Sequence, residues 1–230
     1  MKTTGGTDDQ KRRAGERAAE AVEDGDVVGL GTGSTAAYAI RALGRAVDDG
    51  LDVVGVPTSF DSRHLAREVG VRVGSLEGVD GIDLAIDGAD QFDTQLAAIK
   101  GGGAAHAREK VVAAVADRLV LVADPSKSAE TLSRSVPLEI LPDARPAVER
   151  DVVDLDGVPT LRRAEHKDGP VVTDNGNLIL DCEFGPIDDP AGLASSLASV
   201  PGVVEHGLFV DLADAAYVGT DDGVEVRTAD

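Results

Sequence analysis

The stretch GDVVGLGTGSTAAYAIRALG, residues 25–44, contains the signals of a strand, a tight turn and a helix in direct succession. An apolar run at 27–30 predicts a buried strand, and the small and apolar residues from 36 onward recur at helical spacing. The turn between them, GTGST at 31–35, presents hydroxyls and backbone N–H groups at a helix N-terminus, where the helix dipole favours an anion. The turn therefore leaves three possibilities: it binds a dinucleotide, it binds the phosphate of a smaller molecule, or it binds no ligand.

A dinucleotide fits this turn poorly. The turn satisfies the glycine pattern G-x-G-x-x-G/A, but that fingerprint also needs an acidic residue about 20 residues further on. The next predicted strand, 52–56, is followed by Pro-Thr-Ser and carries no carboxylate at its C-terminal end. A P-loop is excluded because no Gly-Lys-Ser/Thr follows the turn. A single phosphate and an unliganded turn, in which Ser34 or Thr35 caps the helix, both remain open at this point.

The composition limits the class of protein. Of the 230 residues, 42% are hydrophobic, which is enough for a substantial core, whereas aromatic residues make up only 3% and the formal charge is −20. This acidic field repels a nucleic-acid backbone, so no nucleic-acid partner is expected. The acidic residues are dispersed along the chain and lysines are scarce, which indicates adaptation to high salt.

The expected location is the cytoplasm, with no membrane partner. The single Cys182 excludes an internal disulfide and suits a reducing compartment, and its place in an apolar–polar alternation predicts a buried strand position. The N-terminal sequence MKTTGGTDDQKRR lacks the apolar region of a signal peptide. No apolar stretch of the sequence approaches the length of a membrane span.

Strands and helices alternate over the first half of the chain. Helices are expected near 8–23, directly after the glycine turn, near 61–69 and at 104–116, and strands at 26–30, 52–56, 71–73, 83–87 and 119–123. This alternation predicts an α/β fold in which helices cover both faces of a Rossmann-like parallel sheet.

From about residue 131 the order of elements changes. The sequence predicts strands at 136–141, 158–163, 177–183 and 203–210, helices at 144–155 and 190–199, and a final hairpin of strands 215–219 and 223–227. The order β-α-β-β-α-β is that of the ferredoxin-like split motif. We therefore expect a Rossmann-like catalytic domain of residues 1–130 plus 207–230 and a smaller ferredoxin-like α+β domain of residues 131–206.

Polar residues gather in loops that follow the predicted strands. These loops are GTGST at 31–35, DGAD at 87–90, KGGG at 100–103 and DPSK at 124–127. Ligands of open parallel sheets bind beyond the C-terminal ends of the strands, so these loops predict one shared site. Asp87 and Asp90 lack the spacing of a calcium loop, and the histidines form no i, i+4 pair, so no metal is expected. Carboxylates flanked by Gly and Ala suit hydrogen bonds to sugar hydroxyls better.

The KGGG loop opens the helix predicted at 104–116. Its consecutive glycines leave backbone N–H groups unobstructed, which makes a nest for an oxyanion, and Lys100 adds positive charge; the alternative is a flexible loop. On the same helix, Glu109 shares a face with small and apolar residues. Such a carboxylate is either partnered by a buried cation or held for proton transfer, because partial burial raises its pKa towards that of a useful base.

Four motifs, GLGTGSTAA, LAIDGAD, IKGGGAAHAREKVV and VADPSK, have the order and spacing of the type A ribose-5-phosphate isomerase family, which the chain resembles over nearly its whole length. The segments VVTDNGNLILD and VPGVVEHGLF resemble the second domain of that family. The resemblance implies a cofactor-free aldose–ketose isomerase that interconverts ribose 5-phosphate and ribulose 5-phosphate through an enediolate. It also implies that the protein forms a homodimer or homotetramer and that its ligand is a small-molecule sugar phosphate.

The resemblance further implies roles for individual residues. Glu109 is the base that carries a proton between C1 and C2, and Lys100 with the glycine amides stabilises the enediolate oxygens. Asp87 and Asp90 hold hydroxyls and assist ring opening. The phosphate lies against the 32–35 turn, with Lys127 as the cation and Lys11 assisting. The implied substrate-binding residues are Lys11, Thr32, Gly33, Ser34, Thr35, Asp87, Gly88, Ala89, Asp90, Lys100, Gly101, Gly102, Gly103 and Lys127.

Three departures from the family pattern and the competing functions need to be weighed. Gln91 stands where the family usually has Glu, in a position to retune Asp90; TSFDS at 58–62 replaces the usual TSxxT spacing; and His106-Ala107 precede the Arg-Glu-Lys motif where Leu-Thr is common. A sugar-phosphate sensor without catalysis is the main alternative, although such regulators carry an N-terminal helix-turn-helix and only about one helix precedes the first strand here. An amino-sugar phosphate deaminase or coenzyme A transferase of related fold explains the KGGG and REK motifs poorly.

The dispersed acidic charge generates a first testable prediction. In molar KCl the Debye length is about 3 Å, against about 10 Å at 0.1 M, so self-repulsion is screened only at high salt. We expect the midpoint of urea unfolding to fall as KCl is lowered from molar concentration. An unchanged urea midpoint without added salt would contradict the predicted adaptation to high salt.

Overall fold

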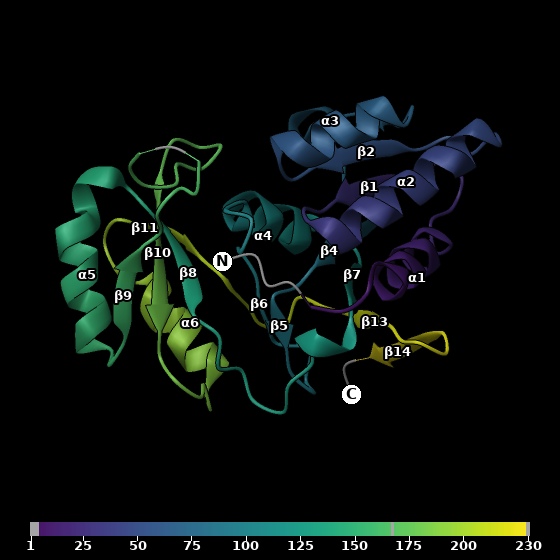
Figure 1. Ribbon diagram of the computed structural model, residues 1–230. Coiled ribbons are helices and arrows are strands. Elements are labelled where there is room, and N and C mark those ends of the chain that lie inside the picture. Colours follow the sequence, from purple (N-terminus) through teal and green to yellow (C-terminus); the bar gives the residue numbers. More distant parts are fainter. Residues whose placement is uncertain (1–4, 167, 229–230) are drawn as a thin grey trace.

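The computed structural model describes residues 5–166 and 168–228, which form three sheets (Figure 1). The largest sheet has the strand order β14-β13-β7-β4-β1-β2-β3. Its strands are β1 (Val27–Leu30), β2 (Val54–Pro57), β3 (Arg72–Val73), β4 (Leu84–Gly88), β7 (Leu119–Ala123), β13 (Ala215–Gly219) and β14 (Val224–Thr228). All neighbours run parallel except β14, which closes the predicted C-terminal hairpin with β13. The sheet confirms the predicted Rossmann-like α/β architecture.

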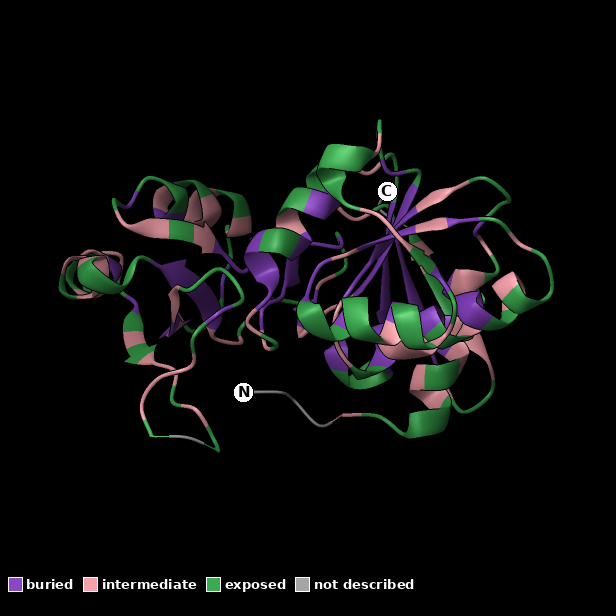
Figure 2. Cartoon of the chain, turned by 90° about the horizontal axis from the view of Figure 1, so that it is seen from above, coloured by how far each residue is buried: buried purple, intermediate pink, exposed green. Residues whose placement is uncertain are grey.

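Helices cover both faces of this sheet. They are α1 (Asp8–Ala19), α2 (Ser34–Asp48), α3 (Phe60–Glu68) and α4 (His106–Val115), with the 3₁₀ helices η1 (Leu76–Gly78) and η2 (Pro125–Lys127) in the connections. Successive strand residues alternate between the faces: Leu84 and Ile86 pack in the cluster of α1 and α2, whereas Ala85 packs in that of α4. Figure 2 shows the strands as a buried band between helices with exposed outer surfaces. Burial on both faces requires the nearly continuous apolar strands that the sequence contains.

The second sheet belongs to a separate α+β unit at the other end of the molecule (Figure 1). Its elements are β8 (Val136–Ile140), η3 (Pro142–Ala144), α5 (Arg145–Asp154), β9 (Val158–Leu161), β10 (Leu178–Glu183), α6 (Pro190–Ala198) and β11 (Val203–His206). The antiparallel order β11-β8-β10-β9 is that of the ferredoxin-like motif and confirms that prediction. Cys182 lies fully buried on β10, as expected. We propose that residues 131–206 form this domain and that residues 1–130 and 207–230 form the other.

The third sheet was not predicted, and it corrects the strand expected at 203–210. Its strands are β5 (Gln91–Phe92), β6 (Ala98–Ile99) and β12 (Leu208–Phe209), in the order β12-β6-β5. The predicted strand is broken at Gly207, so that β11 pairs within the second sheet and β12 pairs with β6. At the break, Gly207 N donates to Pro137 O at 2.7 Å, and Gly207 O accepts from Lys100 N at 2.8 Å. The chain thus crosses from one domain to the other against the KGGG loop.

Two predicted helix bounds were also wrong. The first helix ends at Ala19 rather than near 23, because the N–H groups of Ala21 and Val22 bond to carbonyls three residues back, in a tighter turn that ends the regular helix. The helix predicted from 104 begins at His106, because Ala104 has a φ of 59° in the left-handed region. Among the described residues, no helix combines the length and the apolar character that a membrane crossing needs.

The crossing at Gly207 can be tested by a substitution. A Cβ atom at this position would lie 2.3 Å from Lys100 O and 2.7 Å from Pro137 Cδ, so the backbone has to shift. We expect Gly207→Ala to lower the free energy of unfolding by about 1–3 kcal/mol in chemical denaturation. Gly81→Ala is the matched control, because a Cβ there meets no atom within 4 Å. Equal stability of the two variants would contradict the close approach.

Candidate active site

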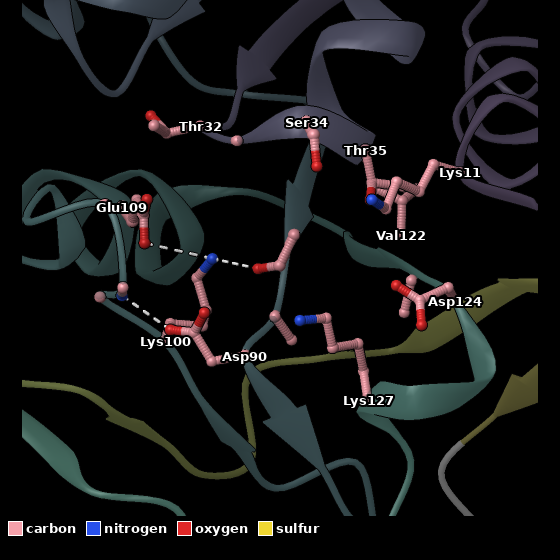
Figure 3. A pocket seen from close by; sticks show the side chains of 17 residues that line it. Lys11, Thr32, Ser34, Thr35, Asp90, Lys100, Glu109, Val122, Asp124 and Lys127 are labelled. Carbon is pink, nitrogen blue, oxygen red and sulfur yellow. Dashed lines mark hydrogen bonds and ion pairs between the residues drawn. The ribbon is translucent and has the colours of Figure 1, made fainter. Parts of the chain in front are cut away.

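A pocket of about 300 Å³ lies at the C-terminal ends of β1, β4 and β7 (Figure 3). Its wall consists of Lys11, Thr32, Gly33, Ser34, Thr35, Gly88, Ala89, Asp90, Lys100, Gly101, Gly102, Gly103, Glu109, Val122, Ala123, Asp124 and Lys127. The structure therefore brings the predicted loops together, as the strand-end argument requires. Every residue predicted for the site is in this wall except Asp87, which is buried behind it.

The turn at 31–35 is shaped by close backbone contact. A Cβ at Gly31 would lie 2.1 Å from Asp87 Oδ1, and Gly33 has a φ of 110°, so both positions require glycine. Helix α2 starts after Gly33 with no side-chain hydrogen bond at its N-terminus, so the alternative in which Ser34 or Thr35 caps the helix is wrong. The first N–H groups of α2 are left for another acceptor, such as a bound anion.

Two lysines face this helix N-terminus. Figure 3 shows Lys11, from α1, beside Thr35, and Lys127, from η2, reaching into the pocket, both on the side away from Glu109. Burial is the main cause that lowers the pKa of Lys127, although Asp124 acts in the opposite direction. This end of the pocket combines helix amides with cationic groups and suits a dianionic phosphate.

At the other end, Lys100 lies between two carboxylates. Its Nζ is 3.0 Å from Asp87 Oδ2 and 3.2 Å from Glu109 Oε2, and it donates a hydrogen bond to Gly88 O. All three side chains are at most 5% exposed. The other oxygen of Asp87, Oδ1, accepts hydrogen bonds from Thr32 N at 3.0 Å and from Gly88 N at 2.7 Å. Asp87 thus joins the phosphate-binding turn to the lysine.

The electrostatics of this group favour a proton acceptor at Glu109. Burial, and next the neighbouring Asp87 carboxylate, raise the pKa of Glu109 to about 8, although Lys100 acts in the opposite direction. Burial alone would lower the pKa of Lys100, but Asp87 and Glu109 offset this and raise it above its ordinary value. Glu109 Oε2 has the ion pair with Lys100 and no further hydrogen-bond partner among the described residues. The carboxylate is therefore able to accept a proton from a ligand.

Specific contacts fix the conformation of the KGGG loop in this structure. Gly101 has a φ of 106°, and a Cβ at Gly102 would lie 2.6 Å from Asp90 Oδ1. Gly102 N donates to Asp90 Oδ2 at 2.7 Å, whereas Gly103 N donates to no described residue. The loop thus presents two N–H groups, one of them held by a carboxylate that lines the pocket.

Sequence reasoning missed some of the residues around the site. Arg162 donates to the carbonyls of Gly101 at 2.8 Å and Gly102 at 3.3 Å and pairs with Asp181. The only signal for this pair was opposite charge on β10 and on the residue directly after β9, two adjacent segments whose register a sequence does not provide. Asp124 was quoted within a motif without a role; it is fully buried and lines the pocket.

Two of the departures from the family pattern, Gln91 and the segment at 58–62, have structural roles. Gln91 Oε1 accepts hydrogen bonds from Ser133 N at 2.8 Å and Arg134 N at 3.0 Å, so it fixes the segment between η2 and β8 and makes no hydrogen bond with Asp90. Ser59 and Ser62 form the capping box of α3. Among the described residues, no three His, Cys, Asp or Glu side chains come close enough to hold a metal ion.

Comparisons with known proteins agree with this geometry. The profile of the family described as ribose 5-phosphate isomerase A (phosphoriboisomerase A) matches residues 54–223. The chain is 67% identical to "Ribose-5-phosphate isomerase A" of Haloarcula marismortui, over 97% of each chain. It is 63% identical to the protein of the same name from Natronomonas pharaonis, over 99% of this chain and 100% of that one.

Solved structures show the same likeness. A D-ribose-5-phosphate isomerase in complex with phospho-erythronic acid has a TM-score of 0.95 at 41% identity, and 97% of this chain and 100% of that chain are covered. Ribose 5-phosphate isomerase A from Methanocaldococcus jannaschii has a TM-score of 0.93 at 40% identity, with the same coverage.

The raised pKa of Glu109 predicts a pH dependence of stability. Its pKa is about 8 in the folded protein against an ordinary value of 4.5. A group whose pKa is higher in the folded state contributes stability that is complete below its unfolded pKa and is lost as the pH rises through its folded pKa. We therefore expect the free energy of unfolding of the wild type, relative to Glu109→Gln, to decrease from about pH 5 to about pH 8.

Urea unfolding of both proteins at a series of pH values in molar KCl measures this difference. Glu23→Gln removes a carboxylate from the exposed surface and serves as the control. If the free energy of unfolding of the wild type minus that of Glu109→Gln stays constant from pH 5 to pH 8, the pKa of Glu109 is not raised in the folded protein.

Proposed function

The chain belongs to the ribose 5-phosphate isomerase A family, and from this premise we propose which residues carry out the interconversion of D-ribose 5-phosphate and D-ribulose 5-phosphate. In this reaction the C2 proton of the open-chain aldose moves to C1 and the O2 hydroxyl proton moves to O1, through an enediolate. No atom is gained or lost, and the electrons are redistributed within the sugar. The enzyme therefore needs a base, a group that stabilises the enediolate charge, and a site for the phosphate.

Glu109 is the base. The observation that carries this proposal is its carboxylate in the pocket wall, buried, with a pKa raised to about 8, beside the cation of Lys100. A pKa near neutrality is the most effective for general base catalysis, because the group is partly ionised and still binds a proton strongly. Glu109 removes the C2 proton and returns it to C1, and the carboxylate is regenerated at the end of the turnover.

Lys100 and the glycine loop stabilise the enediolate. Lys100 is in the pocket wall and stays charged between Asp87 and Glu109. The N–H groups of Gly102 and Gly103 act as preorganised donors to the developing oxyanion, which is worth most in a site that excludes water. The substrate has to displace the Asp90 carboxylate from Gly102 N, which leaves Asp90 free to accept a hydrogen bond from a sugar hydroxyl.

Asp87 and Asp90 then have different roles in the reaction. Asp90 lines the pocket and is placed to hold hydroxyls and assist ring opening. Asp87 is behind the wall, where two backbone N–H groups and Lys100 engage its carboxylate. This placement favours a role for Asp87 through Lys100, which it holds charged and in position.

The phosphate lies at the end of the pocket away from Glu109. The N–H groups at the start of α2 and the hydroxyls of Ser34 and Thr35 bind its oxygens, with Lys127 and Lys11 as counter-charges. The Thr32 hydroxyl instead donates to Ser59 Oγ at 2.8 Å and points away from this end of the pocket, so Thr32 contributes through its backbone. Binding energy from the phosphate holds the reacting carbons against Glu109. The relative bound to phospho-erythronic acid supports a sugar phosphate as the ligand of this chain.

The proposed location and oligomeric state rest on the cysteine content and on the family resemblance. The enzyme acts in the cytoplasm, where a single buried thiol such as Cys182 stays reduced, and it forms a homodimer or homotetramer as the family resemblance implies. Sedimentation in molar KCl measures the assembly.

The assignment of the base is tested by turnover of ribose 5-phosphate, without added metal, in molar KCl. Glu109→Gln keeps the size of the side chain but removes the base, so kcat should fall about 10²–10⁴-fold while binding of the sugar phosphate persists. Glu23→Gln is the control and should keep full activity. A wild type that binds the sugar phosphate without converting it would identify a sensor instead, and an active Glu109→Gln would exclude Glu109 as the base.

A further inference from the structure

Arg162 connects the second domain to the glycine loop of the active site. It follows β9, and its Nη1 donates to Gly101 O at 2.8 Å and to Gly102 O at 3.3 Å. The other side of the guanidinium makes a two-point contact with Asp181 on β10, Nε to Oδ2 at 2.8 Å and Nη2 to Oδ1. The Arg162 side chain is only 10% exposed. One planar group therefore bridges a strand of one domain and two consecutive carbonyls of the other.

The two carbonyls belong to the peptide groups that form the oxyanion site. The carbonyl of Gly101 and the N–H of Gly102 are parts of one peptide group, as are the carbonyl of Gly102 and the N–H of Gly103. A cationic donor at a carbonyl oxygen fixes the plane of its peptide and polarises the N–H on the opposite side. The contacts of Arg162 thus fall on the two peptide groups that present an N–H to the pocket.

Apart from the bond of Gly102 N to Asp90 Oδ2, which the substrate has to displace, the loop has few other means to hold this orientation. Gly101 adopts a left-handed φ of 106°, and glycine is the residue with the largest backbone freedom to lose. Within the loop, Ala104 N donates to Gly101 O at 3.0 Å, so this carbonyl accepts from both Ala104 and Arg162. Among the described residues, Arg162 is the only partner found for Gly102 O.

We propose that Arg162 is a positioning residue for the isomerisation, which orients and polarises the Gly102 and Gly103 N–H groups towards the enediolate, and that Asp181 holds it in place. This inference rests on the proposed function of the glycine loop. It goes beyond a structural link between domains, because the N–H groups act on charge that develops only in the transition state. Loss of Arg162 therefore lowers kcat and leaves KM nearly unchanged.

Steady-state kinetics in molar KCl provide the first test. Arg162→Ala should lower kcat about 10- to 100-fold, less than the about 10²–10³-fold typical of removing an oxyanion donor itself. The adjacent Arg163→Ala is the matched control, because Arg163 is exposed and contacts no loop carbonyl. Arg162→Lys should recover only part of the activity, since one ammonium cannot hold both carbonyls and Asp181 together. Guanidinium, at concentrations too low to unfold the protein, should restore the activity of Arg162→Ala.

Ligand binding tests the inference without turnover. Phospho-erythronic acid carries a planar carboxylate at the reacting end, whereas inorganic phosphate occupies only the phosphate end. Measured by calorimetry, Arg162→Ala should weaken the binding of phospho-erythronic acid at least several-fold and leave the affinity for inorganic phosphate unchanged. If Arg162→Ala does not fold, Arg162→Lys is compared in the same way.

Three outcomes overturn the positioning role while the proposed function stands. They are an unchanged kcat, a rise in KM alone, or an equal loss of phosphate and phospho-erythronic acid binding, each with an active wild type. A wild type that never converts ribose 5-phosphate overturns the proposed function instead, so the two failures are distinguishable.

Discussion

The structure depends on one buried ion group, Lys100 between Asp87 and Glu109. An ammonium and two carboxylates in a nearly dry site are costly to bury, and they are stable only when each charge has close partners. Asp87 has those partners in two backbone N–H groups and Lys100, whereas the only partner found for Glu109 within residues 5–166 and 168–228 is Lys100. The unequal division of contacts leaves Asp87 firmly held and Glu109 as the carboxyl with a raised pKa, which suits proton exchange.

This ion group explains the third sheet and the broken strand. Asp87 is at the end of β4, Glu109 is on α4, and Lys100 directly follows β6, so three elements have to be held in register. The short strands β5 and β12 pair with the two edges of β6 directly before Lys100, and the crossing at Gly207 hydrogen-bonds the backbone of Lys100 itself. A regular strand through residue 207 would remove this contact.

The sequence predicted the fold class, the order of elements and the loops of the pocket, because each follows from local periodicity and from the rule that ligands bind at strand ends. It did not predict the three-stranded sheet, whose two-residue strands are too short for any periodicity. It also missed the contact of Arg162 with the glycine loop, which depends on the placement of one domain against the other. The burial of Asp87 behind the wall rests on its hydrogen bonds to the turn at 31–35, which no spacing of residues indicates.

The few lysines of this acidic protein that the structure describes lie mostly at the pocket. Lys11, Lys100 and Lys127 line the pocket, and Lys110 shares the Phe209 ring with Lys100; Lys2 and Lys167 lie outside the described residues. A net charge of −20 repels an anionic sugar phosphate at long range, but molar salt shortens the Debye length to about 3 Å, so only charges in direct contact act on the substrate. Three of the four lysines in the described part of the chain line the pocket, and the fourth lies beside Phe209 with Lys100. In such salt the local cations and helix amides, and not the field of the whole protein, determine binding.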